Sequence, residues 1–361
     1  MAERVAYVFV HGLSGTGEYD KEYAKKPYWG RSSGDIVAEL RGRGLNAHAA
    51  SVSAQGSAWD RACELYAQIE GTRCDYGLAH SREFGHSRVG RDFFGQELFP
   101  NIDSNTKLVF IAHSFGGVTV RLFAELLANG SEIERDASRS MGVSGLFCGE
   151  RADRVAAIVT LAAPTNGTTA YNSDKGSDDE KKHLKLSPRY HLLHKMLQTA
   201  TKVKRDGRDE RDWADYDMQV DHAIALNKSV ETLSHVYYLS VAADATEVGP
   251  DGTRVPIRTI CDPLMVKNCA LMGAYEGVSP AGVKFNDAWQ ANDGLVNTLS
   301  ARAPFGAVAR DLKGSDPEPG VWNVMDDLHV DHSYFQGGFT RKVNPRSFYD
   351  DLIERLTALP L

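Results

Sequence analysis

Four short apolar runs are spaced along the chain and predict buried strands. They are rich in Val, Ile, Leu, Ala and Tyr, and they occupy residues 5–10, 107–112, 154–161 and 236–240. Runs of this length are typical of strands that are covered on both faces of a parallel sheet. We therefore expect a central sheet rather than a helical bundle.

Segments of helical period separate and follow these runs, at residues 35–40, 57–70, 115–129 and 344–359. Ser57 stands where a helix N-cap is expected, and Gly130 stands where a helix would end. Strands that alternate with helices imply a mostly parallel, doubly wound sheet. The sequence thus predicts one elaborated α/β domain over residues 1–361.

Two segments interrupt this alternation. Residues 72–104 are rich in Gly, His, Arg and Phe without a clear period, so we expect an irregular excursion from the sheet. Residues 167–212 are rich in charge but carry an apolar patch at 192–197 with i, i+1, i+4, i+5 spacing. This patch predicts a short helix with one apolar face, either packed on the core or forming a lid.

A serine stands between a predicted strand and a predicted helix. Residues 112–116 read Ala-His-Ser-Phe-Gly, which matches the nucleophile elbow of α/β-hydrolases except that Ala replaces the usual first Gly. The tight turn requires small residues two positions before and after the serine, and Ala112 and Gly116 satisfy this. Ser114 is the candidate nucleophile, and a helix-capping serine is the alternative.

A serine nucleophile needs a base and an orienting acid, which follow it in the order acid, then His in this fold. Asp293 lies in an Asn-Asp-Gly segment that suits a presented carboxylate, although a plain Asp-Gly turn has the same sequence. His329 and His332 share one loop before the last helix, and spacing favours neither. The oxyanion donors are expected to be the amides of Phe115 and Leu13.

Composition and charge argue against several classes of protein. A net charge of -7 leaves no basic excess for nucleic acid, and no apolar run reaches the 18 residues that suggest a membrane span. The first predicted strand begins at Val5, which leaves no room for a signal peptide. Five cysteines are a sparse, odd set, so we expect free thiols over a Cys261–Cys269 disulfide.

A metal site is suggested only weakly by the residues themselves. His80 and His86 lie in the irregular excursion, with Asp60, Asp75 and Glu83 as nearby carboxylates. Their spacing matches no common metal signature, and solvated surface histidines are the simpler interpretation.

Several separate motifs together resemble the zinc-containing thermoalkalophilic bacterial lipases, including related polyester-cleaving esterases. The motifs agree in order and spacing over most of the chain, at residues 59–64 (WDRACE), 75–77 (DYG), 79–80 (AH), 85–86 (GH), 112–117 (AHSFGG), 292–298 (NDGLVNT) and 330–332 (VDH). The resemblance implies an α/β-hydrolase core, a zinc-holding insertion at residues 55–104 and a helical lid at residues 167–215.

The resemblance also implies roles for single residues. Ser114, Asp293 and His332, rather than His329, would form the triad, with Leu13 and Phe115 lending the oxyanion amides. A structural zinc ion would be bound by four side chains without an open position, namely Asp60, His80, His86 and Asp217. This ion would tie the insertion to the segment after the lid.

The chain departs from the family pattern in three respects. Tyr334 and Phe339 stand where the family has acidic calcium ligands, which argues against calcium. The lid segment is shorter and more charged, which argues against interfacial activation and a preference for long-chain fats and fits bulky or polymeric esters. The family is secreted, yet this chain shows no signal peptide, so a cytoplasmic location is the alternative.

The expected function is hydrolysis of acylglycerols or other carboxylic esters, including polyesters, through an acyl-enzyme. Substrates would be small-molecule, lipid or polymeric esters, with transient contact to a lipid interface. The alternatives are an acyltransferase or cyclase with the same triad, and a non-catalytic binding protein on the same scaffold.

Overall fold

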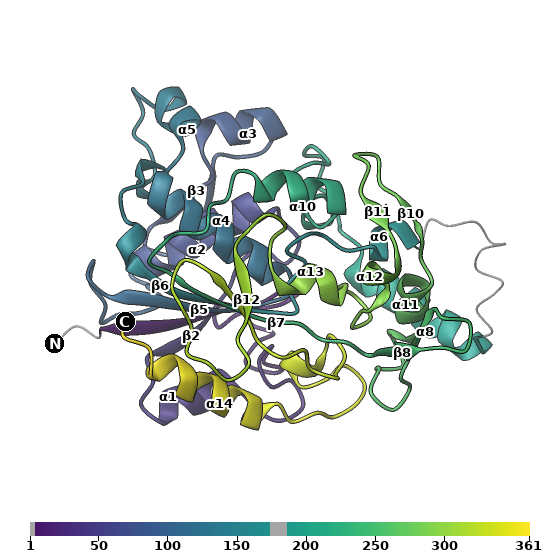
Figure 1. Cartoon of the computed structure of the whole chain (residues 1–361). Helices are drawn as coiled ribbons and strands as arrows, with labels where there is room; N and C mark the ends of the chain where they lie inside the picture. Colours follow the sequence, from purple (N-terminus) through teal and green to yellow (C-terminus); the bar gives the residue numbers. More distant parts are fainter. Residues whose placement is uncertain (1–3, 174–185) are drawn as a thin grey trace.

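A seven-stranded parallel sheet forms the centre of the molecule (Figure 1). The computed structural model describes residues 4–173 and 186–361. The strand order is β12-β13-β7-β6-β5-β1-β2. The strands are β1 (Val5–Val10), β2 (Ala47–Ala50), β5 (Lys107–His113), β6 (Val155–Leu161), β7 (Tyr237–Val241), β12 (Ala309–Asp311) and β13 (Trp322–Val324). The predicted doubly wound parallel sheet is confirmed.

Helices cover both faces of this sheet (Figure 1). α2 (Ala58–Glu70) and α4 (Phe115–Asn129) pack on one face, and α1 (Ile36–Gly42) and α14 (Arg346–Thr357) pack on the other. Successive side chains of β1 enter the two layers alternately, as the period of a strand requires. The sheet therefore separates two hydrophobic cores.

The excursion at residues 72–104 is more regular than predicted. It contains the antiparallel pair β3 (Arg73–Asp75) and β4 (Val89–Asp92), with α3 (Leu78–Phe84) between them. α5 (Glu132–Ala137) lies beside α3, where the Glu134 carboxylate accepts hydrogen bonds from the amides of Ala79 and His80 at 3.0 and 2.7 Å. Strands this short, with exposed polar residues, have no apolar alternation that sequence could reveal.

Several further short elements were not predicted by periodicity. They are α6 (Ala170–Ser173), α9 (Ala214–Asp217), α10 (Val220–Asn227), β8 (Thr246–Val248), β9 (Arg254–Pro256), α11 (Val266–Gly273), β10 (Gly277–Val278), β11 (Lys284–Phe285), α12 (Asp287–Gln290) and α13 (Thr298–Arg302). Single 3-10 turns occur at η1 (Gly145–Cys148), η2 (Ala152–Arg154) and η3 (Tyr334–Gln336).

The predicted apolar patch at residues 192–197 lies on α8 (Pro188–Thr201), which confirms a short helix there. Leu197 is buried, whereas Leu192 and Met196 are 63% and 56% exposed, so the patch has an inner and an outer part. Residues 174–185 of the predicted lid lie outside the described residues. Within the described part of the chain, no helix has the length and apolarity needed to cross a membrane.

Candidate functional site

Ser114 stands on a sharp turn between β5 and α4, as the elbow motif predicts. Its φ of 55° is rare for a residue with a side chain. Glycines let this turn and the loop after β1 approach each other closely. A Cβ on Gly116 would lie 2.3 Å from the Val10 carbonyl oxygen, and one on Gly12 would lie 2.7 Å from the Ser114 Cβ. The Ser114 side chain makes no capping hydrogen bond to α4, so the capping interpretation has no support.

Asp293 and His332 form a buried pair. His332 Nδ1 lies 2.7 Å from Asp293 Oδ2, and the His332 amide donates to the Asp293 carbonyl at 3.0 Å. The other carboxylate oxygen accepts hydrogen bonds from the amides of Leu295 and Val296 at 2.9 and 2.8 Å. His329 is exposed on the same loop and is not part of this pair. The structure thus distinguishes the two histidines that spacing could not separate.

A cavity of about 390 Å³ brings these groups together. Ser114, His332 and Leu13 line it, and α8 contributes its inner residue Leu197. Asp293 lies behind His332 and is buried. The cavity therefore places the candidate nucleophile, the candidate base and one candidate oxyanion residue around the same space.

The two candidate oxyanion residues come from loops that follow neighbouring strands, β1 and β5. Phe115 is the first residue of α4, where an amide has no acceptor within the helix. Leu13 lies just beyond β1 on the cavity wall. Their positions agree with the predicted roles, which stay predictions.

A buried arginine supports both loops from α2. Arg61 hydrogen-bonds to the carbonyl of His11, and its guanidinium lies 5.1 Å from the centre of the Phe115 ring. It also donates to the Ser53 carbonyl at 2.7 Å and to Thr119 Oγ1 at 2.9 Å. Burial lowers the pKa of Arg61 to about 10. These bonds give a buried guanidinium the acceptors it needs.

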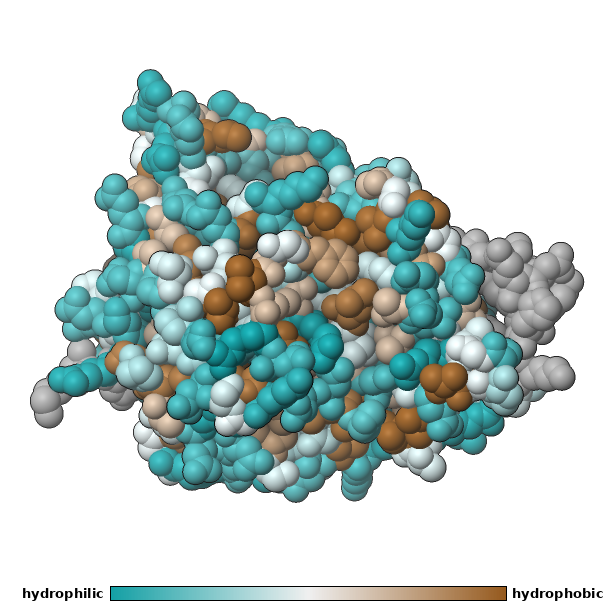
Figure 2. Space-filling model, in the orientation of Figure 1, coloured by the Kyte–Doolittle hydropathy of each residue, from teal (hydrophilic) through white to brown (hydrophobic). Residues whose placement is uncertain are grey.

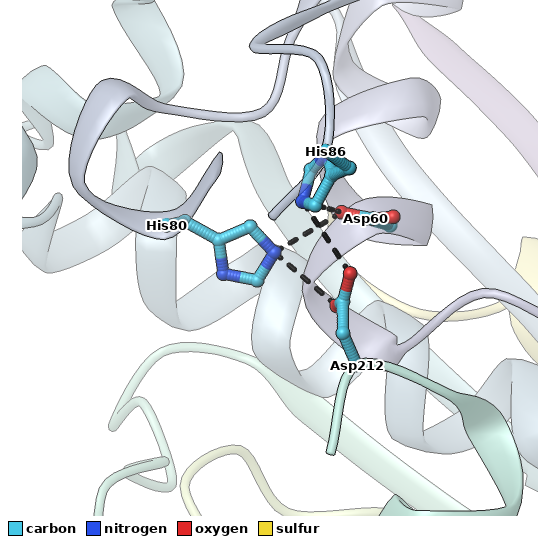
Figure 3. Close-up of side chains that lie close together, drawn as sticks. All are labelled: Asp60, His80, His86 and Asp212. Carbon is cyan, nitrogen blue, oxygen red and sulfur yellow. Dashed lines mark hydrogen bonds and ion pairs between the residues drawn. The ribbon is translucent and has the colours of Figure 1, made fainter. Parts of the chain in front are cut away.

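A second cluster lies away from the cavity and joins Asp60, His80, His86 and Asp212 (Figure 3). One ligand atom from each side chain lies within 4.8 Å of all the others. His80 Nε2 is 3.2 Å from Asp60 Oδ1 and 3.3 Å from Asp212 Oδ1, while His86 Nε2 is 3.4 Å from Asp212 Oδ2. The side chains come from α2, α3, the loop after α3 and the segment before α9.

These separations fit a tetrahedral metal shell. Ligand atoms about 2.0 to 2.1 Å from a tetrahedral ion lie roughly 3.3 to 3.4 Å apart. His86 Nε2 is also buried without a hydrogen-bond partner among the described residues, as a nitrogen aimed at an ion would be. Two imidazoles and two carboxylates are a donor set that divalent cations accept. The cluster can therefore hold such a cation.

The fourth member of the cluster differs from the prediction. Asp212 takes the place expected for Asp217, because a bridge between Trp213 and Gly56 holds the preceding residue against the start of α2. Asp217 instead accepts a hydrogen bond from the Ala58 amide at 2.7 Å, and burial raises its pKa to about 7. Local sequence similarity could not locate Asp212, because its position depends on this long-range pairing.

The surroundings hold the cluster in place. Arg208 Nη1 lies 2.6 Å from Asp60 Oδ2 and 3.2 Å from Asp212 Oδ2, and the Ser57 hydroxyl donates to Asp212 Oδ1 at 2.6 Å. Burial alone would lower the pKa of His80, but its hydrogen bonds to Asp212 and Asp60 raise it to about 9. The acidic pair thus favours positive charge at this position.

Comparison with known proteins places this architecture in a family. Residues 3–188, just over half of the chain, match the family model described as a lipase-like, C-terminal domain. The chain belongs to this lipase family. The match confirms the lipase family that the motifs suggested, and the fold is that of an α/β-hydrolase.

Relatives and solved structures of this lipase family align along nearly the whole chain. Lipase 2 of Staphylococcus aureus is 30% identical over 380 residues, which cover 97% of this chain and 53% of the relative. The chain thus spans about half the length of the curated relatives it matches.

Three solved structures are also similar. EstA from Clostridium botulinum is 29% identical, with a TM-score of 0.83 and coverage of 99% of this chain and 88% of that one. The Staphylococcus hyicus lipase is 26% identical, with a TM-score of 0.80 and coverage of 99% and 98%. Lipase 1 from Pelosinus fermentans is 30% identical, with a TM-score of 0.78 and full coverage of both chains.

Proposed function

We propose that this chain is a serine carboxylic ester hydrolase, a lipase or esterase, with Ser114, His332 and Asp293 as its triad. The buried Asp293–His332 pair carries the proposal, because it presents an imidazole to the cavity that Ser114 lines. Membership of a lipase family supports the same reaction class.

The reaction follows from the positions of these groups. Ser114 Oγ attacks the ester carbonyl while His332 Nε2 takes its proton, and Asp293 keeps the proton of His332 on Nδ1. The amides of Leu13 and Phe115 donate to the oxyanion, whose charge is larger in the transition state than in the substrate. His332 then protonates the leaving alcohol, and water removes the acyl group by the same steps in reverse.

The substrates we propose are acylglycerols and other carboxylic esters, with polyesters as a further class. Leu13 and Leu197 give the cavity apolar walls that suit an acyl chain. The exposed Leu192 and Met196 lie on the outer side of α8, where a lipid surface could be contacted. Figure 2 shows further exposed hydrophobic residues, in brown, scattered among hydrophilic ones around this end of the molecule.

We also propose that the cluster of Asp60, His80, His86 and Asp212 binds zinc. Four protein ligands leave no position for water, so the ion would act as a structural tie and take no part in the chemistry. It would connect α2 and α3 to the segment before α9. Tyr334 and Phe339 stand at the positions where the resembled family has acidic calcium ligands, so calcium is not part of this proposal.

Hydrolysis of p-nitrophenyl esters of graded acyl length by the wild type and Ser114→Ala tests the function. We expect Ser114→Ala to lower kcat by at least about 10³-fold because the nucleophile is lost. Ser138→Ala, which changes a buried serine outside the cavity, is the matched control and should keep its activity. Adding an alcohol or amine acceptor separates hydrolysis from the acyltransferase alternative.

A further inference from the structure

A chain of buried hydrogen bonds joins the loop of Leu13 to the loop of His332. The Gly12 amide donates to the Tyr28 hydroxyl at 3.0 Å, and this hydroxyl lies 2.6 Å from His113 Nδ1. His113 Nε2 lies 3.1 Å from the carbonyl oxygen of His332. Tyr28 and His332 lie in loops and His113 ends β5, so these hydrogen bonds join segments that are far apart in the sequence.

The partners at the two ends fix the direction of this chain. An amide can only donate and a carbonyl can only accept. The Tyr28 hydroxyl therefore accepts from Gly12 and donates to His113 Nδ1, which leaves the proton of His113 on Nε2 to donate to His332. Burial keeps the pKa of His113 well below its usual range, in agreement with a neutral ring. The Gly12 amide, the Tyr28 hydroxyl, both ring nitrogens of His113 and the His332 carbonyl then all have a hydrogen-bond partner.

Both ends of the chain touch groups that the proposed reaction uses. Gly12 precedes Leu13 and packs directly against Ser114. The carbonyl of His332 is held by His113 while its amide and its side chain are held by Asp293, so the His332 backbone is fixed on both sides. A shift at either end would move an oxyanion donor or the imidazole relative to Ser114.

We propose that Tyr28 and His113 are positioning residues, whose hydrogen bonds keep the oxyanion loop and the histidine loop in register around Ser114. This inference rests on the proposed ester hydrolase function. We call this chain of hydrogen bonds from Gly12 through Tyr28 and His113 to His332 the relay. The groups that the relay holds act most strongly in the transition state, so loss of the relay should lower kcat and leave KM nearly unchanged. A packing role alone would not have this effect, because a Phe ring at residue 28 fills the same space as Tyr.

The main test is Tyr28→Phe, with Tyr238→Phe as the matched control. Both hydroxyls are buried and accept one backbone amide at 3.0 Å, from Gly12 and from Leu233, but Tyr238 lies on β7 away from the cavity. We expect a similar fall in Tm, of a few degrees, for both variants. With p-nitrophenyl butyrate, Tyr28→Phe should lose about tenfold or more in kcat, and Tyr238→Phe less than about twofold.

The second test separates hydrogen bonding from packing at residue 113. His113→Phe keeps a ring but removes both hydrogen bonds, whereas His113→Gln can place an amide N–H near the position of Nε2 and donate to His332. We expect His113→Gln to recover part of the kcat that His113→Phe loses. Combining His113→Phe with Tyr28→Phe should cost far less than the product of the two single losses, because both break one relay.

Each result decides the proposal. A Tyr28→Phe variant that folds and keeps kcat within about twofold overturns the relay, and the ester hydrolase function stands if Ser114→Ala is inactive. If Tyr28→Phe does not fold, the comparison of His113→Gln with His113→Phe decides, and equal kcat values for these two overturn the relay. A wild type that hydrolyses no ester would instead overturn the proposed function, and the relay with it.

Discussion

At the scale of single residues, the candidate site depends on glycines that let backbone segments approach closely. Gly12 lies in the loop after β1 and faces Ser114. Its role is steric, since a Cβ there would lie 2.7 Å from the Ser114 Cβ and 3.1 Å from the Ser114 Oγ. Any larger residue must displace the nucleophile or the oxyanion loop.

Gly12→Ala should therefore lower kcat/KM for ester hydrolysis by about 10²-fold, because small displacements of reacting groups are costly. Gly42→Ala is the matched control, since no atom lies within 4 Å of a Cβ built at the end of α1. That variant should keep its activity and gain about 0.4 to 1 kcal/mol of stability. Steady-state kinetics and thermal unfolding measure both effects, and an unimpaired Gly12→Ala enzyme would contradict the steric account.

Glu64 on α2 links stability to pH. Burial raises the pKa of Glu64 from 4.5 to about 7, although hydrogen bonds from the Ser53 amide and the Tyr76 hydroxyl oppose this shift. Between these two pH values the native state holds a proton that the unfolded chain has lost. Stability from this group is therefore present at low pH and falls as pH rises toward 7.

Glu64→Gln should remove this dependence, because a neutral amide can make both hydrogen bonds. Relative to the wild type, its free energy of unfolding should rise between pH 5 and pH 8 by on the order of 2 kcal/mol. Urea unfolding at several pH values measures the difference. A constant difference across that range would show that Glu64 ionises freely in the folded protein.

Sequence could predict the residues of the proposed triad better than those of the metal cluster, for a physical reason. Ser114 can be recognised from the small residues that its tight turn requires. Asp293 can be recognised from the Asn-Asp-Gly turn in which it lies. The choice of His332 required the family resemblance, and the structure supports it by burying that side chain against Asp293. Asp212 lacks a local mark, because its position comes from the pairing of Trp213 with Gly56.

At the scale of elements, the metal cluster connects three segments that are far apart in the sequence. α2 supplies Asp60, α3 supplies His80, and the segment before α9 supplies Asp212. Isolated short helices such as α3 are unstable in water without tertiary contacts. A bound ion would therefore stabilise the small subdomain of β3, β4 and α3 more than the central sheet.

Metal analysis of two aspartate variants tests this arrangement. Asp212→Asn should bind well below one zinc per chain, because a charged ligand is lost. Asp217→Asn should keep about one zinc per chain, since its amide oxygen can still accept the Ala58 hydrogen bond. Chelation should lower the Tm of the wild type and of Asp217→Asn, but change that of Asp212→Asn little. The opposite order of zinc content would restore Asp217 as the ligand.

The strength of the sequence signal differs between elements. The inner strands β1, β5, β6 and β7 were predictable because they are covered on both faces and are almost wholly apolar. β12 and β13, the last two strands at one side of the sheet, have three residues each, and the strands of the β3–β4 pair have three and four. No period can be recognised in so few positions, so their pairing depends on tertiary contacts.

At the scale of the whole molecule, the candidate site brings together residues that lie more than 300 positions apart in the sequence, from Leu13 to His332. They meet at one edge of the sheet. Leu13 follows β1, Ser114 follows β5, and His332 lies in a loop after β13. In open parallel sheets, ligands bind beyond the carboxyl ends of the strands. The parallel topology explains why these loops meet, whatever their separation in sequence.

The central claim is that Ser114 is a nucleophile activated by His332, and covalent trapping tests it most directly. The protein is treated with diethyl p-nitrophenyl phosphate, and the release of p-nitrophenol, the intact mass and the modified peptide are measured. We predict one diethylphosphoryl group per chain on Ser114, formed at the rate at which ester hydrolysis is lost, and at least about 10²-fold slower in His332→Ala. Ester hydrolysis that persists in Ser114→Ala, or rapid stoichiometric modification of another residue that abolishes activity, would contradict the account.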